Sequence, residues 1–161
     1  MRYNEYLIQY DCIEGNEDKL WYIASRYSSL MEIDKKSGEI IEIYDIPSEL
    51  QYRTFVKDND CFFLFPSGKG KLIEYSITSK ETKIHEIPNL VFERGTNWSA
   101  RHIRIGDNVY LSWANPVIVR FNIVTKEWKK IDSWLNLIEN DKEYTIWFKN
   151  APFRYKDDVF F

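Results

Sequence analysis

A short pattern that occurs four times constrains the fold of this chain more than any other feature of its sequence. Each copy has two polar residues, then an aliphatic residue or cysteine, then aromatic or bulky apolar residues. The third positions of the copies are Leu20, Cys61, Val109 and Val159, so the copies are 41, 48 and 50 residues apart. Recurrence at a fixed period of roughly 20–50 residues is the sequence signature of a repeat architecture. We therefore expect an array of similar small units.

A second pattern follows the first three copies and helps to divide each unit into strands. It alternates apolar and polar residues and leads into a polar turn, at residues 30–34, 72–76 and 118–122. The turns begin with Asp34, Ser76 and Asn122, whose side chains can cap neighbouring backbone groups. A more polar segment then completes each unit, as expected of an outer strand. The pattern predicts four consecutive strands in each unit.

The composition agrees with this division, because aromatic residues make up 17% of the chain and suit a pleated, packed surface. We expect one repeat array over residues 1–161. Its units span approximately residues 6–47, 51–88 and 99–132, and an incomplete unit spans residues 153–161.

A four-stranded unit of roughly 40–50 residues is typical of a blade in a β-propeller. We therefore predict an all-β chain of propeller-type antiparallel blades, about three blades and part of a fourth, with an incomplete ring. An ordinary β-sandwich whose strands are similar by coincidence is the alternative.

The third unit resembles the blades of kelch-type and related β-propellers, in which a Tyr/Phe-Asp turn precedes a threonine and a tryptophan. Phe121, Asn122, Thr125 and Trp128 carry this resemblance. The double glycine of true kelch repeats is replaced at positions 24–25, 65–66 and 112–113. The resemblance implies a fold and no catalytic residue, because one fold hosts many functions.

The predicted array has fewer blades than a closed ring, which has about four to eight. Three explanations stay open: a truncated sequence, two chains that pair to complete a ring, or an open stack. Uncovered apolar faces and unpaired strand edges favour association, so self-association through open blade faces is one expectation.

Charge and targeting signals narrow the classes of partner. The 22 basic and 25 acidic residues give a net charge of −3, which argues against a dedicated nucleic-acid binder. No stretch approaches 18 apolar residues, and Glu5, Asp11 and Glu14 interrupt the start of the chain, so we expect neither a membrane span nor a signal peptide. We predict a cytoplasmic protein.

Two cysteines and two histidines leave little material for a metal site, and we expect no cofactor.

The candidate ligand site is the loop face of the predicted propeller, where the loops between second and third strands and between blades gather. The candidate residues lie in these loops or at the start of a first strand: Arg26, Tyr27, Arg53, Lys69, Lys71, Arg94, Asn97, Trp98, Arg101, Asn115 and Trp147. Arginine supplies forked donors for anionic groups, and aromatic rings offer faces for stacking. Alternatively, the arginines pair with acidic residues of neighbouring loops.

Two of these residues lie at the same distance in sequence from the first pattern of their unit. Arg53 and Arg101 each lie eight residues before the third position of the first pattern in their unit, at Cys61 and Val109. This offset predicts equivalent places at the start of a first strand, near the central channel.

These features predict a non-catalytic binding or interaction module for a protein, a small polar or anionic ligand, or a glycan. The alternative is a fragment of a propeller-fold enzyme of lyase, hydrolase or glycan-processing type. His102 is the candidate general base if it faces the channel, but no serine or cysteine recurs at a matching place. His85 is expected to be solvated on an outer strand. We therefore predict no catalytic residue.

Overall fold

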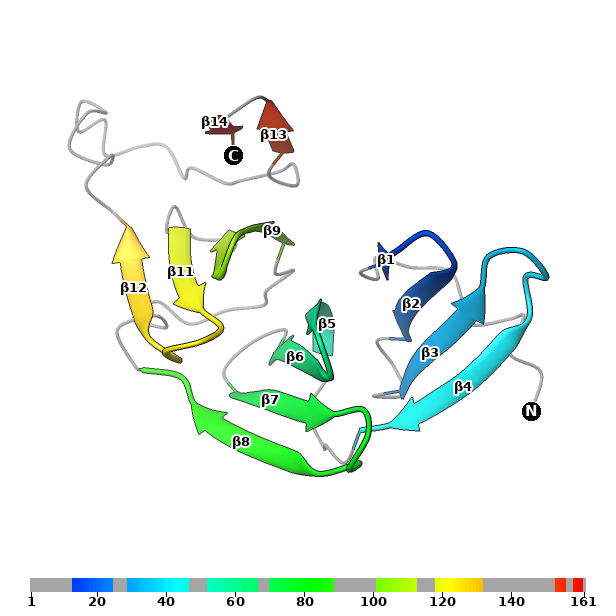
Figure 1. The fold of residues 1–161 in the computed structure, drawn as a ribbon. Coiled ribbons are helices and arrows are strands. Elements are labelled where there is room, and N and C mark those ends of the chain that lie inside the picture. The colour runs from blue at the N-terminus through cyan, green and yellow to red at the C-terminus, as the bar shows by residue number, and fades with distance from the viewer. Residues whose placement is uncertain are drawn as a thin grey trace, which may run out of the picture. The chain divides into compact units, whose positions relative to one another are not determined.

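The computed structural model describes residues 13–24, 29–46, 52–66, 70–88, 101–112, 118–131, 153–155 and 158–160. These residues form three four-stranded sheets and a two-stranded hairpin (Figure 1). The chain divides into two compact units, Met1–Glu86 and Ile87–Phe161, and each is described by itself. Within the described ranges, no helix is long and apolar enough to span a membrane.

The first unit contains two four-stranded sheets. The strands of the first sheet are β1 (Ile13–Gly15), β2 (Lys19–Ala24), β3 (Ser29–Asp34) and β4 (Ile40–Asp45). The strands of the second sheet are β5 (Tyr52–Asp58), β6 (Cys61–Pro66), β7 (Lys71–Ser76) and β8 (Thr82–Glu86).

The second unit contains the third sheet and the hairpin. The strands of the third sheet are β9 (Arg101–Ile105), β10 (Asn108–Ser112), β11 (Ile118–Asn122) and β12 (Trp128–Ile131). The hairpin pairs β13 (Phe153–Tyr155) with β14 (Asp158–Phe160).

Each four-stranded sheet keeps its strands in chain order, and all neighbouring strands are antiparallel. The second sheet shows the expected gradient of polarity. Every residue of β6 after Cys61 is buried, whereas β8 has no buried residue. The predicted all-β fold of four-stranded antiparallel units is therefore confirmed.

The turn between the third and fourth strands has the same structure in all three sheets. The amide of its first residue donates to the carbonyl oxygen of its closing glutamate, from Asp34 to Glu39, Ser76 to Glu81 and Asn122 to Glu127, each at 2.9 Å. The side-chain oxygen of its first residue accepts the amides of Ser37 (2.7 Å), Ser79 (3.1 Å) and Thr125 (2.8 Å), respectively. These bonds confirm the predicted capping role of Asp, Ser and Asn.

A second set of bonds joins this turn to the turn between the first two strands. The carbonyl oxygens of Asp18, Asp60 and Asp107 accept the amides of Lys35 (2.9 Å), Ile77 (2.7 Å) and Ile123 (2.9 Å), respectively. Asp60, and not Asn59, is therefore equivalent to Asp18 and Asp107.

This equivalence corrects the sequence alignment of the second sheet by one residue. Phe62, and not Cys61, occupies the place of Leu20 and Val109. The slip matters because successive residues of a strand point to opposite faces of the sheet.

Gly38 has a positive φ of 73° in the first of these turns, where Lys80 and Lys126 have values of 60° and 63°. A Cβ atom on Gly38 would meet nothing within 4 Å, so backbone strain alone opposes a side chain there. We expect Gly38→Ala to lower the free energy of unfolding by about 1 kcal/mol. Gly38→Asn should cost less, because asparagine tolerates this conformation better. Urea unfolding of the two variants tests this, and equal losses would contradict it.

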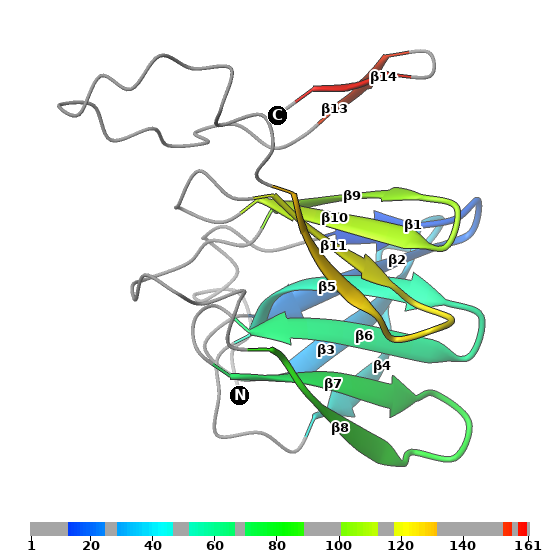
Figure 2. The ribbon, with the colours of Figure 1, turned by 90° about the vertical axis from the view of Figure 1, so that its left-hand side faces the viewer.

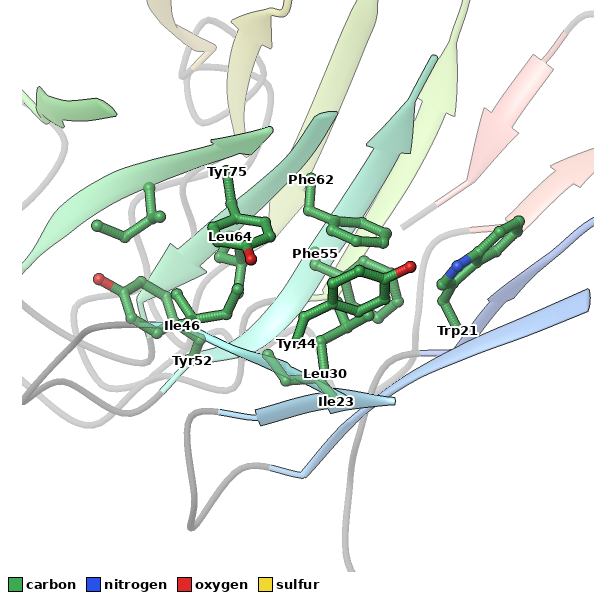
Figure 3. Close-up of a cluster of buried hydrophobic side chains, with 11 residues drawn as sticks. Trp21, Ile23, Leu30, Tyr44, Ile46, Tyr52, Phe55, Phe62, Leu64 and Tyr75 are labelled. Atoms are coloured by element: carbon green, nitrogen blue, oxygen red, sulfur yellow. The ribbon is translucent and has the colours of Figure 1, made fainter. Parts of the chain in front are cut away.

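The core of the first unit lies between its two sheets. Figure 3 shows aromatic side chains of both sheets in this cluster, among them Trp21 and Tyr44 of the first sheet and Phe55, Phe62 and Tyr75 of the second. The Phe62 ring makes edge contacts with the rings of Trp21, Tyr44 and Phe55 at centroid distances of 6.5, 5.3 and 5.9 Å. Edge-to-face packing of this kind stabilises beyond the buried area alone.

Candidate functional site

The connections of each four-stranded sheet alternate between two ends. We call the end with the capped turns the turn end, and the opposite end, where the second strand connects to the third and the chain leaves the sheet, the loop end. Figure 2 shows the two tight turns of the second sheet together at its turn end. Backbone amides at the turn end bond within a turn or to the neighbouring turn of the same sheet. The predicted ligand residues belong to the loop end by their place in the chain.

Lys71 is the one predicted site residue whose side chain the structure describes. It begins β7 at the loop end, and its Nζ atom lies 2.6 Å from Glu86 Oε1. Both side chains are exposed, so the net contribution of this ion pair to stability is small, about 0–1 kcal/mol. Lys71 is thus paired with Glu86, its cross-strand neighbour on β8, and its role in ligand binding stays a prediction.

Arg53 and Arg101 lie at the loop-end starts of β5 and β9, as predicted, but they are not equivalent positions. Arg101 pairs with Ser112, whose counterpart in the second sheet is Phe65, and Phe65 pairs with Thr54. Arg53 falls instead in the register shift between Tyr52 and Thr54. The prediction that Arg53 and Arg101 occupy equivalent positions, which rested on their equal offset of eight residues, was therefore wrong.

The other eight predicted site residues lie outside the described residues: Arg26, Tyr27, Lys69, Arg94, Asn97, Trp98, Asn115 and Trp147. Their role in ligand binding stays a prediction.

The structure contains a buried polar network that the sequence patterns did not reveal. Glu32, only 5% exposed, lies in the middle of β3 and pairs across the sheet with Trp21 and Glu42. Its carboxylate accepts hydrogen bonds from Trp21 Nε1 at 3.0 Å, from Tyr44 Oη at 2.7 Å and from Lys19 Nζ. The sequence signal was a glutamate between apolar residues of a strand.

Opposing effects set the pKa of Glu32. Burial raises it, but hydrogen bonds from Lys19, Tyr44 and Trp21 outweigh burial, so the pKa lies below its usual value of 4.5. The carboxyl group is therefore ionised at neutral pH, when it accepts all three bonds.

Two cations of the second sheet contact this same face of the first sheet. Lys80 Nζ lies 2.5 Å from Glu42 Oε1 and 4.5 Å from the centroid of the Tyr44 ring. Lys57 Nζ lies 4.8 Å from the centroid of the Trp21 ring. The hydrogen bond with Glu42 raises the pKa of Lys80, and the same bond lowers the pKa of Glu42. Acids and rings on one sheet are thus matched by lysines on the next.

His85 was expected to be solvated, but the structure places it beside a carboxylate. It is half-buried on β8, and its Nε2 atom lies 2.8 Å from Glu74 Oε2. His102 pairs across the strands with Leu111 and is half-buried. Among the described side chains, no three His, Cys, Asp or Glu residues gather as metal ligands would.

Comparison of the sequence with known protein families finds no match, and comparison with curated proteins finds none either. Solved structures do match. Virginiamycin B lyase from Staphylococcus aureus is similar at 13% identity with a TM-score of 0.57, over 75% of this chain and 40% of the lyase chain. BamB from Moraxella catarrhalis is similar at 12% identity and a TM-score of 0.51, over 76% of this chain and 34% of BamB. The designed protein Ika8 matches 91% of this chain and 40% of its own at 10% identity and a TM-score of 0.56.

These proteins are β-propellers. The sheets of this chain have the fold of propeller blades. The chain spans about 40% of the length of the lyase that it matches, and identities this low show the fold alone. A specific relation to kelch propellers remains a prediction. In the third blade, the Phe121 and Trp128 rings that carry the kelch resemblance do contact each other, with centroids 4.6 Å apart.

Proposed function

We propose that the chain is a non-catalytic β-propeller binding module that engages its ligand at the loop ends of its blades. The main support is the contrast between the two ends of each blade. At the turn ends, repeated bonds already use the backbone and capping groups. The loop ends carry the connections whose sequences are rich in arginine, lysine and tryptophan.

The ligand chemistry follows from these side chains. Guanidinium groups bind carboxylates, phosphates and sulfates through paired donors, and indole rings stack on sugar faces. We propose an anionic glycan or another small anionic ligand as the preferred class. The absence of a nucleic-acid partner belongs to the same proposal and is supported by the near-balanced charge of the chain. A cytoplasmic location without a membrane partner is proposed with it, on the absence of a long apolar stretch from the sequence.

The enzymatic alternative is a propeller-fold lyase, hydrolase or glycan-processing enzyme. Its support is limited to fold similarity with a lyase, and similarity of fold does not transfer an activity.

Binding of the full chain to an array of neutral, uronic-acid and sulfated oligosaccharides tests the proposal. We expect binding to an acidic class, and we expect Arg101→Ala and Trp98→Ala each to weaken it about tenfold, or roughly 1.4 kcal/mol. Lys36→Ala, which removes an exposed cation at a turn end, is the control and should bind as the parent chain does.

Three results would contradict the proposal. The array could bind no class above background, the two loop-end variants could bind unchanged, or Lys36→Ala could weaken binding equally. The third result would indicate attraction to overall charge instead of a site.

A further inference from the structure

The middle position of the third strand carries a charged residue in every blade, and its sign changes along the chain. Glu32, Glu74 and Arg120 occupy this position, which lies two residues before the capping residue Asp34, Ser76 or Asn122. Their cross-strand partners on the fourth strand are Glu42, Lys83 and Lys129, respectively. Directly opposed residues of neighbouring strands lie on the same face of a sheet. The first blade therefore presents two acids on this face, and the third blade presents two cations.

The acids of the first two blades have partners. Glu32 accepts three hydrogen bonds within its own blade, and Glu74 is paired with His85. The second acid of the first blade, Glu42, is paired with Lys80 of the second blade. Of these pairs, the one between Glu42 and Lys80 joins an acid of one blade to a cation of the next.

Arg120 in the third blade is different. Its side chain is half-buried, and its Nε atom is buried without a hydrogen-bond partner in the part of the chain that the structure describes. A buried donor that lacks an acceptor costs the full desolvation penalty of the group, so native proteins rarely leave one unpaired. Lys129 lies beside Arg120 on the same face and is exposed, and Tyr110 is the opposed residue on β10.

We propose that the face of the third blade that carries Tyr110, Arg120 and Lys129 is a docking surface for a polypeptide that presents a carboxylate to Arg120. Nε and one terminal nitrogen of a guanidinium form a fork that binds both oxygens of a carboxylate. Because Nε is buried in the free chain, the Arg120 side chain turns outward when the partner docks, and the carboxylate then supplies the missing acceptor of Nε. Lys129 adds a second positive charge. This surface is independent of the loop-end ligand site.

Charge at one turn position argues against a second copy of this chain that packs as the second blade packs on the first. On the first blade, the face that carries Glu32 and Glu42 is contacted by Lys80 of the second blade. Lys80 is the fifth residue of the turn that begins at Ser76. The first blade has Gly38 at this position and the third blade has Lys126, so neither offers a carboxylate there. An acidic segment of another polypeptide is the occupant that satisfies Arg120.

NMR of arginine Nε–H groups in the full ¹⁵N-labelled chain tests the proposal directly. The probe is a capped tetraglutamate peptide, with capped tetraglutamine as the neutral control and constant ionic strength throughout. We expect the Arg120 signal, assigned by its loss in Arg120→Lys, to shift and saturate with tetraglutamate and to stay unchanged with tetraglutamine. Arg104 is an internal control, because its Nε already donates to the carbonyl oxygen of Gly106 at 2.9 Å.

Two variants complete the test. Lys129→Met should weaken tetraglutamate binding several-fold, whereas Arg104→Gln should leave it unchanged. Arg120→Met should abolish binding and raise the midpoint of thermal unfolding of the free chain by a few degrees, because it removes the unpaired buried donor.

Four results would overturn the proposal. These are an Arg120 signal that does not move, equal shifts of Arg104 and Arg120, a lower unfolding midpoint in Arg120→Met, or inorganic phosphate that binds as tightly as tetraglutamate. The last result would indicate a simple anion site instead of a protein docking surface.

Discussion

Replacing Glu32 with methionine is expected to lower the free energy of unfolding by about 3 kcal/mol, because it leaves buried donors without an acceptor. Trp21 Nε1 and Tyr44 Oη both donate to the Glu32 carboxylate, and both side chains are buried. Methionine restores much of the volume, so the loss reports the polar contacts more than a cavity. Urea unfolding followed by tryptophan fluorescence measures it.

Glu42→Gln is the matched control for Glu32→Met. Glu42 is the cross-strand neighbour of Glu32, but its ion pair with Lys80 is exposed. Exposed pairs contribute about 0–1 kcal/mol, so the control should lose far less. Equal losses in the two variants, or a loss below about 0.5 kcal/mol in Glu32→Met, would show that burial of the network does not stabilise the fold.

The pH dependence of the same two proteins gives a second measure. Because the pKa of Glu32 in the folded chain is below 4.5, its usual value, its ionisation stabilises the fold at and above that pH. This contribution is lost as the pH falls through the lowered pKa. The difference in stability between the parent chain and Glu32→Met should therefore shrink below about pH 4.5. A difference that stays constant in acid would contradict an ionic role for Glu32.

Phe62→Ala is expected to be the most damaging single truncation in the core of the first unit. Phe62 is 0% exposed, and its ring contacts three aromatic rings from both sheets. Loss of a buried phenylalanine costs about 3–5 kcal/mol, from lost transfer energy and the cavity left behind. For a domain of this size, we expect a fall of roughly 10 °C in the unfolding midpoint, measured by circular dichroism.

Ile84→Ala provides the control for Phe62→Ala in the same sheet. Ile84 lies on the outer strand β8 and is 59% exposed, so its truncation should change stability by less than about 0.5 kcal/mol. A loss in Phe62→Ala as small as that of Ile84→Ala would mean that the two sheets do not share the core.

Much of the architecture was predictable because its signals are local. The capping residues Asp34, Ser76 and Asn122 bond to amides within their own turns, and short-range chemistry of this kind can be read from a few residues. The all-apolar second strands and polar fourth strands were likewise visible in the order of residue types. These features predicted four-stranded blades, and the structure confirms them.

Pairing between strands was not predictable to the same accuracy. The sequence patterns aligned Cys61 with Leu20, and turn bonding shows that Phe62 takes that place. They also equated Arg53 with Arg101, but a register shift between Tyr52 and Thr54 separates the two. A slip of one residue barely changes a pattern of apolar residues, although it moves every side chain to the other face.

The sequence alone determined the repeat, the strand order and the chemistry of the turns, because each depends on residues close together in the chain. Only the tertiary structure decided which charged residues acquire partners. Glu32 is bonded to Trp21 and Tyr44 from the strands on either side, and Glu42 to Lys80 of the next sheet, whereas the Arg120 Nε atom has no partner within the described ranges. Burial and cross-strand distance set those outcomes, and neither is a property of a short stretch of sequence.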